Sequence, residues 1–385
     1  MGGEEERFFM NKDVAIIGGS AAGFFTASLL AQQGLRVRVF EAEDHIRSFS
    51  RTLIVTNHVR HLLAPPSKGA VVNEIHRFEL LSGNRTVTVL LQQPDLVVER
   101  SMLIKELKAQ AKAKGANVLT GHRFLSLKPK GKGLAFTVSR NDDGEQIEEL
   151  AEILVGADGA SSKVAESAGL PKQPTVPVFQ AIVELPRDMP SDVTRVWFIP
   201  EETSYFYWLI PYSPTQGVLG LIGEENHEIR GSLERFLEKR GLEPIEFQNA
   251  QVPHYTRWIP NHRKLGESDI YLVGDAAAHV KVSTMGGIVT GFRGALGVAE
   301  AILNGGSSRE FRYLRRELDL HMLVRRALNR FTQEDYASLL NLLTPSVKRS
   351  LSRFNRDDSG KLLFNSLLKQ PRFLLLGLRY LLYGK

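Results

Sequence analysis

No cysteine occurs among the 385 residues of this sequence. The absence of thiols excludes disulfides, thiolate metal sites, iron–sulfur clusters, cysteine nucleophiles and dithiol redox chemistry. It also excludes a secreted fold held by disulfides and favours a reducing compartment. Hydrophobic residues make up 43% of the chain and charged residues 24%, as in ordinary globular proteins. A chain of this length predicts about two to three domains with well-buried cores.

Long apolar runs are also missing. No run approaches the roughly 20 residues that a membrane-spanning helix needs, and the acidic residues 1–10 lack the apolar core of a signal peptide. His58 and His61 lie three positions apart without an accompanying carboxylate pattern, so no metal site is expected. These absences predict a cytoplasmic protein.

Acidic residues become scarce toward the C-terminus. Residues 306–385 contain 16 Lys/Arg and 7 Asp/Glu, a net charge of +9, whereas the first 305 residues carry −3. Residues 361–385 have Leu, Phe or Tyr at 14 of 25 positions, five Lys/Arg and no acid. This composition predicts either a peripheral contact with the inner face of a membrane or a helix packed over an apolar surface, and both stay open. Nucleic acid is not expected, because no recognisable nucleic-acid module is present.

The patterning alternates between strands and helices. A helix is predicted over residues 100–114, closed by a glycine at 115, and hairpins are predicted around residues 82–84 and 141–144. The second hairpin is expected to pair residues 134–138 with 148–155. A further helix is predicted over 291–303, and only helices are predicted beyond residue 308.

A glycine-rich turn follows the first buried strand. Residues 13–17 predict that strand, residues 24–33 a helix, and residues 35–40 a second strand that ends at Glu41. This unit is typical of the first half of a doubly wound dinucleotide-binding fold. The expected cofactor-binding residues of the turn are Gly18, Gly19, Ser20, Ala21, Ala22 and Gly23.

Each position of this turn has a physical task. Gly18 allows the tight turn, Gly23 lets helix and strand approach, and Ser20 stands where the fingerprint has its second glycine. The turn and the helix N-terminus would hold a pyrophosphate with backbone N–H groups. Glu41, with Ala42 beside it, would accept the ribose hydroxyls and disfavour a 2′-phosphate. A glycine turn without a ligand is the alternative, which the ordered strand, helix, strand and acid disfavour.

Two later motifs and one arginine indicate which dinucleotide binds. Asp158-Gly159 follows a strand and resembles the Asp-Gly motif of flavoprotein hydroxylases, and Gly274-Asp275 resembles their Gly-Asp motif. Arg100 matches the arginine that these proteins place against the flavin phosphates. In this order the motifs resemble the FAD superfamily typified by p-hydroxybenzoate hydroxylase. The resemblance implies FAD as the cofactor, with the second aspartate holding its ribityl chain.

The segment after the Gly-Asp motif is similar to the geranylgeranyl reductase family. Residues 278–288 read AHVKVSTMGGI, where the family has a Val-Lys step and a Thr-Gly-Gly-Gly-Ile-like loop beneath the isoalloxazine. Met285 replaces one glycine of that loop, whereas Gly286 and Gly287 remain and precede Ile288. The resemblance implies that their N–H groups approach the pyrimidine edge of the flavin and stabilise its anionic reduced form.

An aromatic strand is the second feature shared with this family. Residues 205–211 resemble its aromatic-x-Trp-x-Phe-Pro motif, which lines the substrate cavity. Because side chains alternate along a strand, Phe206, Trp208 and Ile210 are expected on one face, with Tyr207 on the other. A well-packed sheet core is the alternative. Flavin-dependent halogenases carry a similar Trp-x-Trp-x-Ile-Pro motif, but the essential lysine of that class is not found here. Lys68 lacks its sequence context.

Two further site assignments are open. Many geranylgeranyl reductases have a cysteine near the flavin, and the corresponding stretch here contains Arg51 instead. Arg51 is therefore a candidate for flavin contact. Tyr207, His279 and flavin-bound water are each admissible as the proton donor, and the sequence does not choose among them.

The predicted fold is α/β, with a doubly wound FAD-binding (Rossmann-like) domain, an inserted antiparallel β-sheet substrate domain and a helical C-terminal tail. The expected ranges are 10–80, 98–172 and 265–305 for the FAD-binding domain, 173–264 with parts of 52–98 for the substrate domain, and 306–385 for the helical region. Trp208 is expected to face the flavin across the substrate cavity.

The resemblance implies an FAD-dependent reductase that hydrogenates C=C bonds of a polyprenyl lipid. Only one nucleotide fingerprint is present, so an external electron donor is expected, either ferredoxin or an NAD(P)H-linked reductant. A flavin monooxygenase or halogenase is the alternative enzyme. A flavin- or lipid-binding protein without turnover is the alternative from another class, suggested by Ser20, Met285 and the missing cysteine.

Overall fold

The computed structural model describes residues 12–46, 52–63, 69–131, 133–224, 228–354 and 356–382. The chain forms two compact units. Unit 1 comprises residues 1–50, 100–174 and 253–318, and unit 2 comprises residues 51–99, 175–252 and 319–385.

Unit 1 is built on a six-stranded sheet in the order β16-β17-β10-β1-β2-β6. Its strands are β1 (Asp13–Ile17), β2 (Arg36–Phe40), β6 (Asn117–Leu119), β10 (Ile153–Gly156), β16 (His262–Leu265) and β17 (Ser268–Leu272). All neighbours pair in parallel except the edge strand β16, which runs antiparallel to β17. The predicted doubly wound topology is confirmed.

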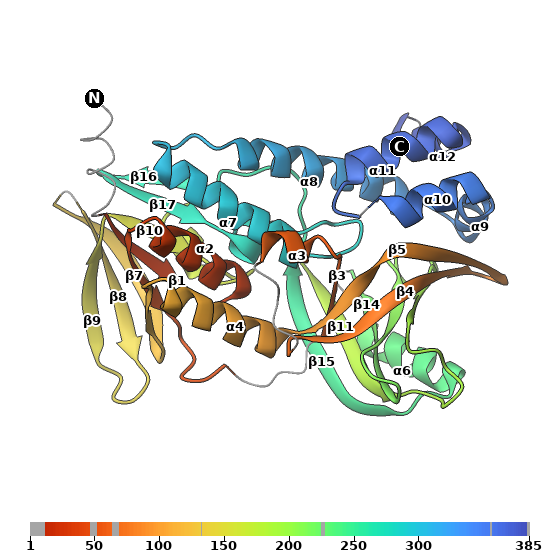
Figure 1. Cartoon of the computed structure of the whole chain (residues 1–385), viewed down its shortest axis with the longest axis horizontal. Coiled ribbons are helices and arrows are strands. Elements are labelled where there is room, and N and C mark those ends of the chain that lie inside the picture. Colours follow the sequence, from red (N-terminus) through yellow and green to blue (C-terminus); the bar gives the residue numbers. More distant parts are fainter. Residues whose placement is uncertain are drawn as a thin grey trace. The chain divides into compact units, whose positions relative to one another are not determined.

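Helices and a small sheet cover the faces of this parallel sheet. The helices α2 (Ala21–Gln32), α4 (Arg100–Ala113) and α7 (Ile288–Leu303) lie side by side (Figure 1). A three-stranded sheet also packs against the parallel sheet through a shared hydrophobic cluster, which includes the short helix α5 (Lys163–Ser167). Its strands are β7 (His122–Lys130), β8 (Gly133–Arg140) and β9 (Gln146–Ala151).

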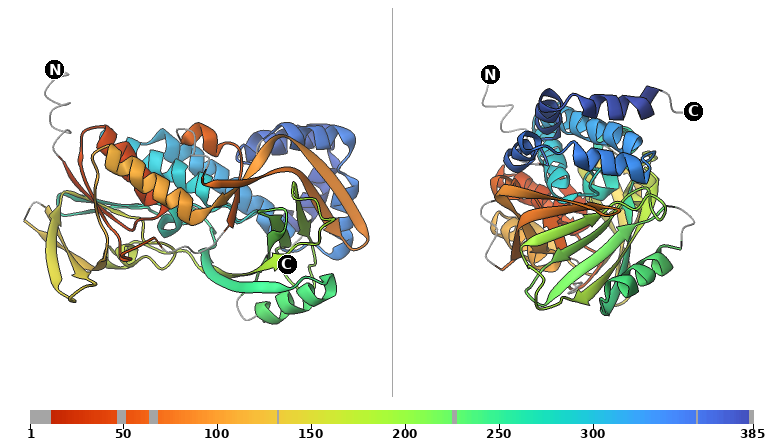
Figure 2. Two further views of the ribbon diagram at one scale, coloured as in Figure 1. Left: turned by 60° about the horizontal axis from the view of Figure 1, so that its bottom comes forward. Right: turned by 90° about the vertical axis from the view of Figure 1, so that its right-hand side faces the viewer.

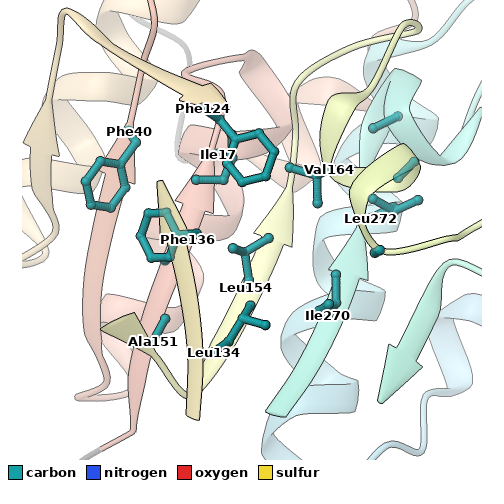
Figure 3. Packing of buried hydrophobic residues seen from close by; sticks show 14 of the residues in the cluster. Ile17, Phe40, Phe124, Leu134, Phe136, Ala151, Leu154, Val164, Ile270 and Leu272 are labelled. Atoms are coloured by element: carbon teal, nitrogen blue, oxygen red, sulfur yellow. The ribbon is translucent and has the colours of Figure 1, made fainter. Parts of the chain in front are cut away.

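The core between the two sheets of unit 1 follows from strand alternation. Ile17, Leu154 and Ile270 from the parallel strands meet Phe124 and Phe136 from the three-stranded sheet (Figure 3). These side chains are at most 5% exposed. Because alternate residues of a strand face opposite ways, Ile17 enters this core while its fully buried neighbour Ile16 faces the other side of the sheet.

Unit 2 is built on a curved eight-stranded sheet in the order β15-β11-β14-β13-β12-β4-β5-β3 (Figure 2). Its strands are β3 (Thr52–Val55), β4 (Val71–Ser82), β5 (Arg85–Glu99), β11 (Thr175–Glu184), β12 (Val193–Trp197), β13 (Tyr207–Pro211), β14 (Gln216–Ile222) and β15 (Pro244–Pro253). From β11 to β3 the neighbouring strands pair antiparallel, except that β12 runs parallel to β4. The predicted antiparallel sheet and the β4–β5 hairpin are confirmed.

Helices complete unit 2. The helix α6 (Ile229–Arg240) packs its Leu233, Phe236 and Leu237 against the sheet. A short helix α3 (Val59–Leu62) follows β3. The C-terminal helices are α8 (Arg309–Leu328), at whose Leu318 the boundary between the units falls, α9 (Gln333–Asn341), α10 (Pro345–Arg353), α11 (Ser359–Lys369) and α12 (Arg372–Leu382).

Three element boundaries differ from the sequence-based predictions. Residues 148–155 are not one strand, because β9 pairs with β8 whereas β10 joins the parallel sheet. The first helix begins at Ala21 rather than residue 24, because the Ser20 side chain caps it. The helix predicted from residue 291 begins about one turn earlier, at Ile288.

Candidate functional site

The turn after β1 requires glycine at two positions for reasons of space. Gly18 has φ +105°, and a Cβ there would lie 2.5 Å from the Ala157 carbonyl oxygen. A Cβ at Gly23 would overlap the carbonyl oxygen of Gly18. The chain therefore approaches itself closely at both positions, and any side chain would force the backbone apart.

Ser20 and Glu41 organise the same turn. The Ser20 hydroxyl accepts a hydrogen bond from the Gly23 N–H at 3.1 Å and so acts as the N-cap of α2. The Glu41 carboxylate accepts one hydrogen bond from the Gly19 N–H and another, of 2.8 Å, from the N–H of Glu43. Serine thus contributes a cap that glycine lacks, and the glutamate holds the turn from the end of β2.

The sequence motifs of unit 1 converge on this turn. The Ala157 carbonyl, next to the Asp-Gly motif, lies against Gly18. A Cβ at Gly274, where φ is +66°, would lie 3.0 Å from the Ala22 Cβ. A Cβ at Gly291 would lie 3.7 Å from the same atom. Segments that are more than 100 residues apart in sequence are therefore in contact within unit 1.

The two motif aspartates have different environments. Asp158 accepts hydrogen bonds from the Ser162 hydroxyl at 2.6 Å and the Val164 N–H at 3.0 Å, so it caps the start of α5. Burial raises the pKa of its carboxyl above the usual range. Asp275, in contrast, is exposed beside the start of α7, and a Cβ at Gly287 would lie 3.4 Å from its Oδ1. An exposed carboxylate beside closely packed backbone can accept hydrogen bonds from the hydroxyl groups of a polyol such as the ribityl chain.

The loop before α7 is a tight turn. Lys281 and Gly286 form an isolated antiparallel bridge, and the Met285 N–H donates to the Lys281 carbonyl oxygen at 2.7 Å. Met285 has φ +52°, a left-handed conformation that suits the glycine found there in the family. Gly287 is the N-cap residue of α7 without a side-chain cap. Ile288 is the first residue of the helix, so the unmatched N–H groups of its first turn are available to an anionic group.

Three other predicted cofactor-binding residues lie at different places. Arg100 is half-buried at the first position of α4. The Ala42 carbonyl oxygen accepts a 2.7 Å hydrogen bond from the Asn141 side-chain amide, which fixes the segment after Glu41. Gly159 needs its left-handed φ of +84° but has open space around it. Arg51 lies outside the described residues.

His279 is enclosed by aromatic rings and a helix. It is 1% exposed, and its ring stacks on Trp258 with centroids 5.8 Å apart. A Cβ at Gly294 of α7 would overlap the imidazole. Neither ring nitrogen has a hydrogen-bond partner among the described residues, and burial lowers the pKa of His279 to about 3. The side chain is therefore neutral at physiological pH and poorly suited to donate a proton.

The aromatic strand β13 of unit 2 alternates as expected. Tyr207 and Leu209 are buried against α6, whereas Trp208 is partly buried and packs with Ile210 in a separate cluster. Partly buried Phe206 lies just before the strand, with its ring centroid 6.0 Å from that of Trp208. Phe206, Trp208 and Ile210 therefore lie away from the core under α6.

Tyr207 points to the opposite face. Its ring stacks on Phe236 of α6 with centroids 4.4 Å apart, and its hydroxyl donates to the Glu202 carboxylate. Burial, reinforced by the neighbouring Glu202 carboxylate, raises the pKa of this hydroxyl far above its usual range. Tyr207 and Trp208 therefore lie on opposite faces of β13. The interpretation of Tyr207 as proton donor stays a prediction, which this position disfavours.

Several contacts that shape these sites were not anticipated from the sequence. Three glycines of α7, at 291, 294 and 297, recur every third residue, and the last meets the ring of Phe311. Glycines at this spacing within a predicted helix indicate that a neighbouring segment packs closely against the helix. Arg325 is 1% exposed, donates to the Ser204 carbonyl oxygen at 2.7 Å and lies over the Tyr205 ring. No sequence signal linked residues that are 121 positions apart.

Neither a metal cluster nor a membrane span is found in the described part of the chain. No group of three or more His, Asp or Glu side chains among the described residues is placed to hold a metal ion. No helix in the described ranges is both long and apolar enough to cross a membrane.

Comparisons with known proteins show the family of this chain. Residues 11–303 match the family model described as an FAD binding domain. The chain is 28% identical over 302 residues to digeranylgeranylglycerophospholipid reductase 2 of Methanothermobacter thermautotrophicus, covering 72% of this chain and 74% of that protein. It is 24% identical over 311 residues to geranylgeranyl diphosphate reductase of Rhodobacter capsulatus, covering 76% and 75%.

Solved structures share the fold. A geranylgeranyl bacteriochlorophyll reductase-like protein from Thermoplasma acidophilum has a TM-score of 0.79 at 18% identity, covering 96% of this chain and 98% of that one. The flavin-dependent brominase Bmp2 has a TM-score of 0.69 at 17% identity, covering 94% and 100%. The predicted fold class, the FAD cofactor and the resemblance to geranylgeranyl reductases are confirmed by these findings together.

Proposed function

This chain belongs to the FAD-binding domain family and is an FAD-dependent oxidoreductase, and we propose that it hydrogenates C=C bonds of a polyprenyl lipid. The observation that carries the proposal is the partly buried aromatic pair of Phe206, which lies just before β13, and Trp208, which lies on it. Such a surface suits a long apolar chain better than a polar substrate. The names of the relatives in Methanothermobacter and Rhodobacter support a prenyl substrate.

The residues of unit 1 fit FAD. The closely packed glycine turn leaves room for a pyrophosphate, and we assign Glu41 to the ribose and exposed Asp275 to the ribityl chain. Arg100 is assigned to the phosphates. The first-turn N–H groups of α7, beside Gly286 and Gly287, would stabilise negative charge on the pyrimidine edge. FAD, when bound and reduced, supplies the hydride for the alkene.

The chain contributes the substrate surface and excludes water. We assign Phe206, Trp208 and Ile210 to the prenyl chain, since an unactivated alkene needs accurate placement and a dry surrounding. Neither Tyr207, which faces α6, nor His279, which is buried and neutral, is available as an acid. We therefore assign the proton to a flavin-bound water molecule, while bulk water is excluded. The electron donor in this proposal is external, either ferredoxin or an NAD(P)H-linked reductant.

Mass spectrometry of the lipid tests this proposal. The FAD-loaded protein is reduced anaerobically, mixed with a geranylgeranyl phospholipid, and the recovered lipid is weighed. Gain of one pair of hydrogens per reduced bond is expected. An unchanged lipid beside flavin that stays reduced would contradict prenyl reduction.

A second function is a flavin-dependent halogenase or monooxygenase. It is favoured by Ile210-Pro211, which matches the halogenase version of the aromatic motif, and by the likeness of the fold to a brominase. Substrate-dependent oxygen consumption by the reduced protein, with a phenol or pyrrole and halide present, is the measurement that would favour it over prenyl reduction.

A further inference from the structure

The most exposed large apolar side chains gather on the last two helices. Among the described residues, Leu375, Leu368 and Phe364 are 69%, 66% and 63% exposed, and the next such residue is Leu90 at 62%. Phe364 and Leu368 are four positions apart in α11 and share one face of that helix. Leu375 belongs to α12, which contacts α11 (Figure 1).

The opposite sides of these helices are anchored within unit 2. The ammonium group of Lys369 donates to the Ser350 hydroxyl of α10 at 2.6 Å, and Ser366 of α11 is buried. Leu376 of α12 packs against a core cluster that contains Phe331. These contacts attach α11 and α12 to the rest of unit 2. The exposure of their apolar side chains is therefore a property of the folded unit rather than of an unattached tail.

Basic side chains accompany this apolar face. The side chains of Lys361 and Arg379 are each 70% exposed and lie 3.7 and 4.0 Å from the carboxylates of Asp358 and Asp335. Arg372 is exposed at the start of α12. Residues 361–385 contain no Asp or Glu. Apolar side chains beside long cationic ones are typical of helices that lie in the interface of an anionic bilayer.

We propose that α11 and α12 form a membrane-docking surface for bilayers that contain anionic lipids. Phe364, Leu368 and Leu375 enter the boundary between headgroups and acyl chains, while the basic side chains contact lipid phosphates. A second copy of the chain fits this surface poorly, because the five Lys/Arg of residues 361–385 outnumber the neighbouring carboxylates of Asp335 and Asp358, so two copies would bring net positive charge together. The proposal does not depend on the reductase activity. If the substrate is a membrane lipid, docking would bring the protein to it.

Co-flotation with vesicles tests the proposal. The FAD-loaded full chain should float with vesicles of phosphatidylcholine and phosphatidylglycerol, more weakly with phosphatidylcholine alone, and less as salt increases. Phe364→Glu/Leu368→Glu should lower the partition coefficient at least about tenfold. Leu90→Glu, which alters an equally exposed leucine of β5, should leave it unchanged. Equal binding by both variants, or no binding by the wild type, would overturn the proposal.

Misfolding and self-association are distinguished from docking by two further measurements. FAD content and thermal unfolding establish that the glutamate variant is folded. If it is not, Lys361→Gln/Arg372→Gln replaces it, and should abolish the preference for anionic vesicles. Sedimentation without lipid is the second measurement: a wild-type dimer that Phe364→Glu/Leu368→Glu makes monomeric would identify a second copy as the occupant and overturn the proposal. Reduction of detergent-dispersed prenyl lipid by the non-binding variant would show that docking and catalysis are separate.

Discussion

The two units use different means to build their surfaces. In unit 1, the proposed FAD-binding residues are placed by glycines, such as Gly18 and Gly23, at which the backbone approaches itself. In unit 2, the proposed substrate surface is placed by large rings, such as Trp208, that alternate along a strand. The first arrangement fails when one methyl group is added, whereas the second fails when a ring is removed. A site formed by close backbone contacts therefore accepts one ligand shape. In a site formed by aromatic side chains, substitution of a ring can change which substrate binds.

Gly18→Ala should have the largest effect. The new methyl group would meet the Ala157 carbonyl in a left-handed residue, so we expect FAD affinity to fall at least about a hundredfold and stability by about 3 kcal/mol. Gly115→Ala is the matched control, because its φ of +99° is similar and nothing lies within 4 Å of the added Cβ. It should cost only about 1 kcal/mol without loss of FAD affinity. FAD titration and urea unfolding measure both, and equal losses would contradict a clash at Gly18.

Buried His279 should make the protein acid-sensitive. Burial lowers the pKa of His279 to about 3, so below its unfolded pKa of about 6.5 the unfolded chain binds a proton that the native state does not. Stability should therefore fall as pH decreases from about 6.5 toward 3, by roughly 2 kcal/mol at about pH 5. His279→Phe should remove this part of the acid dependence. Urea unfolding at several pH values measures it, and parallel curves for both proteins would refute the assignment.

The glycine row of α7 should respond unequally to alanine. Alanine normally stabilises a helix by about 1 kcal/mol relative to glycine. At Gly291 the nearest atom outside the helix would be 3.7 Å from the Cβ, so this gain should remain. At Gly294 the Cβ would displace the His279 ring, so we expect a net loss of about 1–2 kcal/mol. Thermal unfolding of the two variants is the comparison, and a stabilising Gly294→Ala would contradict the packing.

Neighbouring residues of β13 should separate stability from activity. Tyr207→Phe removes the hydrogen bond to Glu202 and should cost about 1 kcal/mol of stability with unchanged turnover. Trp208→Ala should slow lipid reduction at least about tenfold while FAD affinity stays the same. Urea unfolding, FAD titration and lipid turnover of both variants measure this. Reduced turnover in Tyr207→Phe alone would place the substrate on the other face.

Local patterns sufficed for much of unit 1. The first strand, the turn and the acid at Glu41 are neighbours in sequence, and β1 begins and ends at the predicted residues. The glycine fingerprint treats Ser20 as a replacement for glycine and so does not predict its cap, although a serine hydroxyl favours a helix start. The split of residues 148–155 was missed because strand patterning does not reveal the partner strand.

Contacts between distant segments could not be predicted. Alternation along β13 correctly separated Trp208 from Tyr207, but it did not reveal that α6 covers the latter. Arg325 of α8 meets Ser204 through a contact that depends on the whole arrangement of unit 2. The site residues named from family motifs remain proposals, since contacts with FAD and lipid are what would test them.

Reoxidation of the reduced flavin by a prenyl lipid, without oxygen, tests the central claim most directly. The FAD-loaded protein is reduced with dithionite, and flavin absorbance is followed after a geranylgeranyl phospholipid is added. We predict that flavin is reoxidised in proportion to the double bonds lost from the lipid, and more slowly in Trp208→Ala. Flavin that stays reduced with the lipid, but is reoxidised by oxygen with formation of a halogenated or hydroxylated product, would contradict the account.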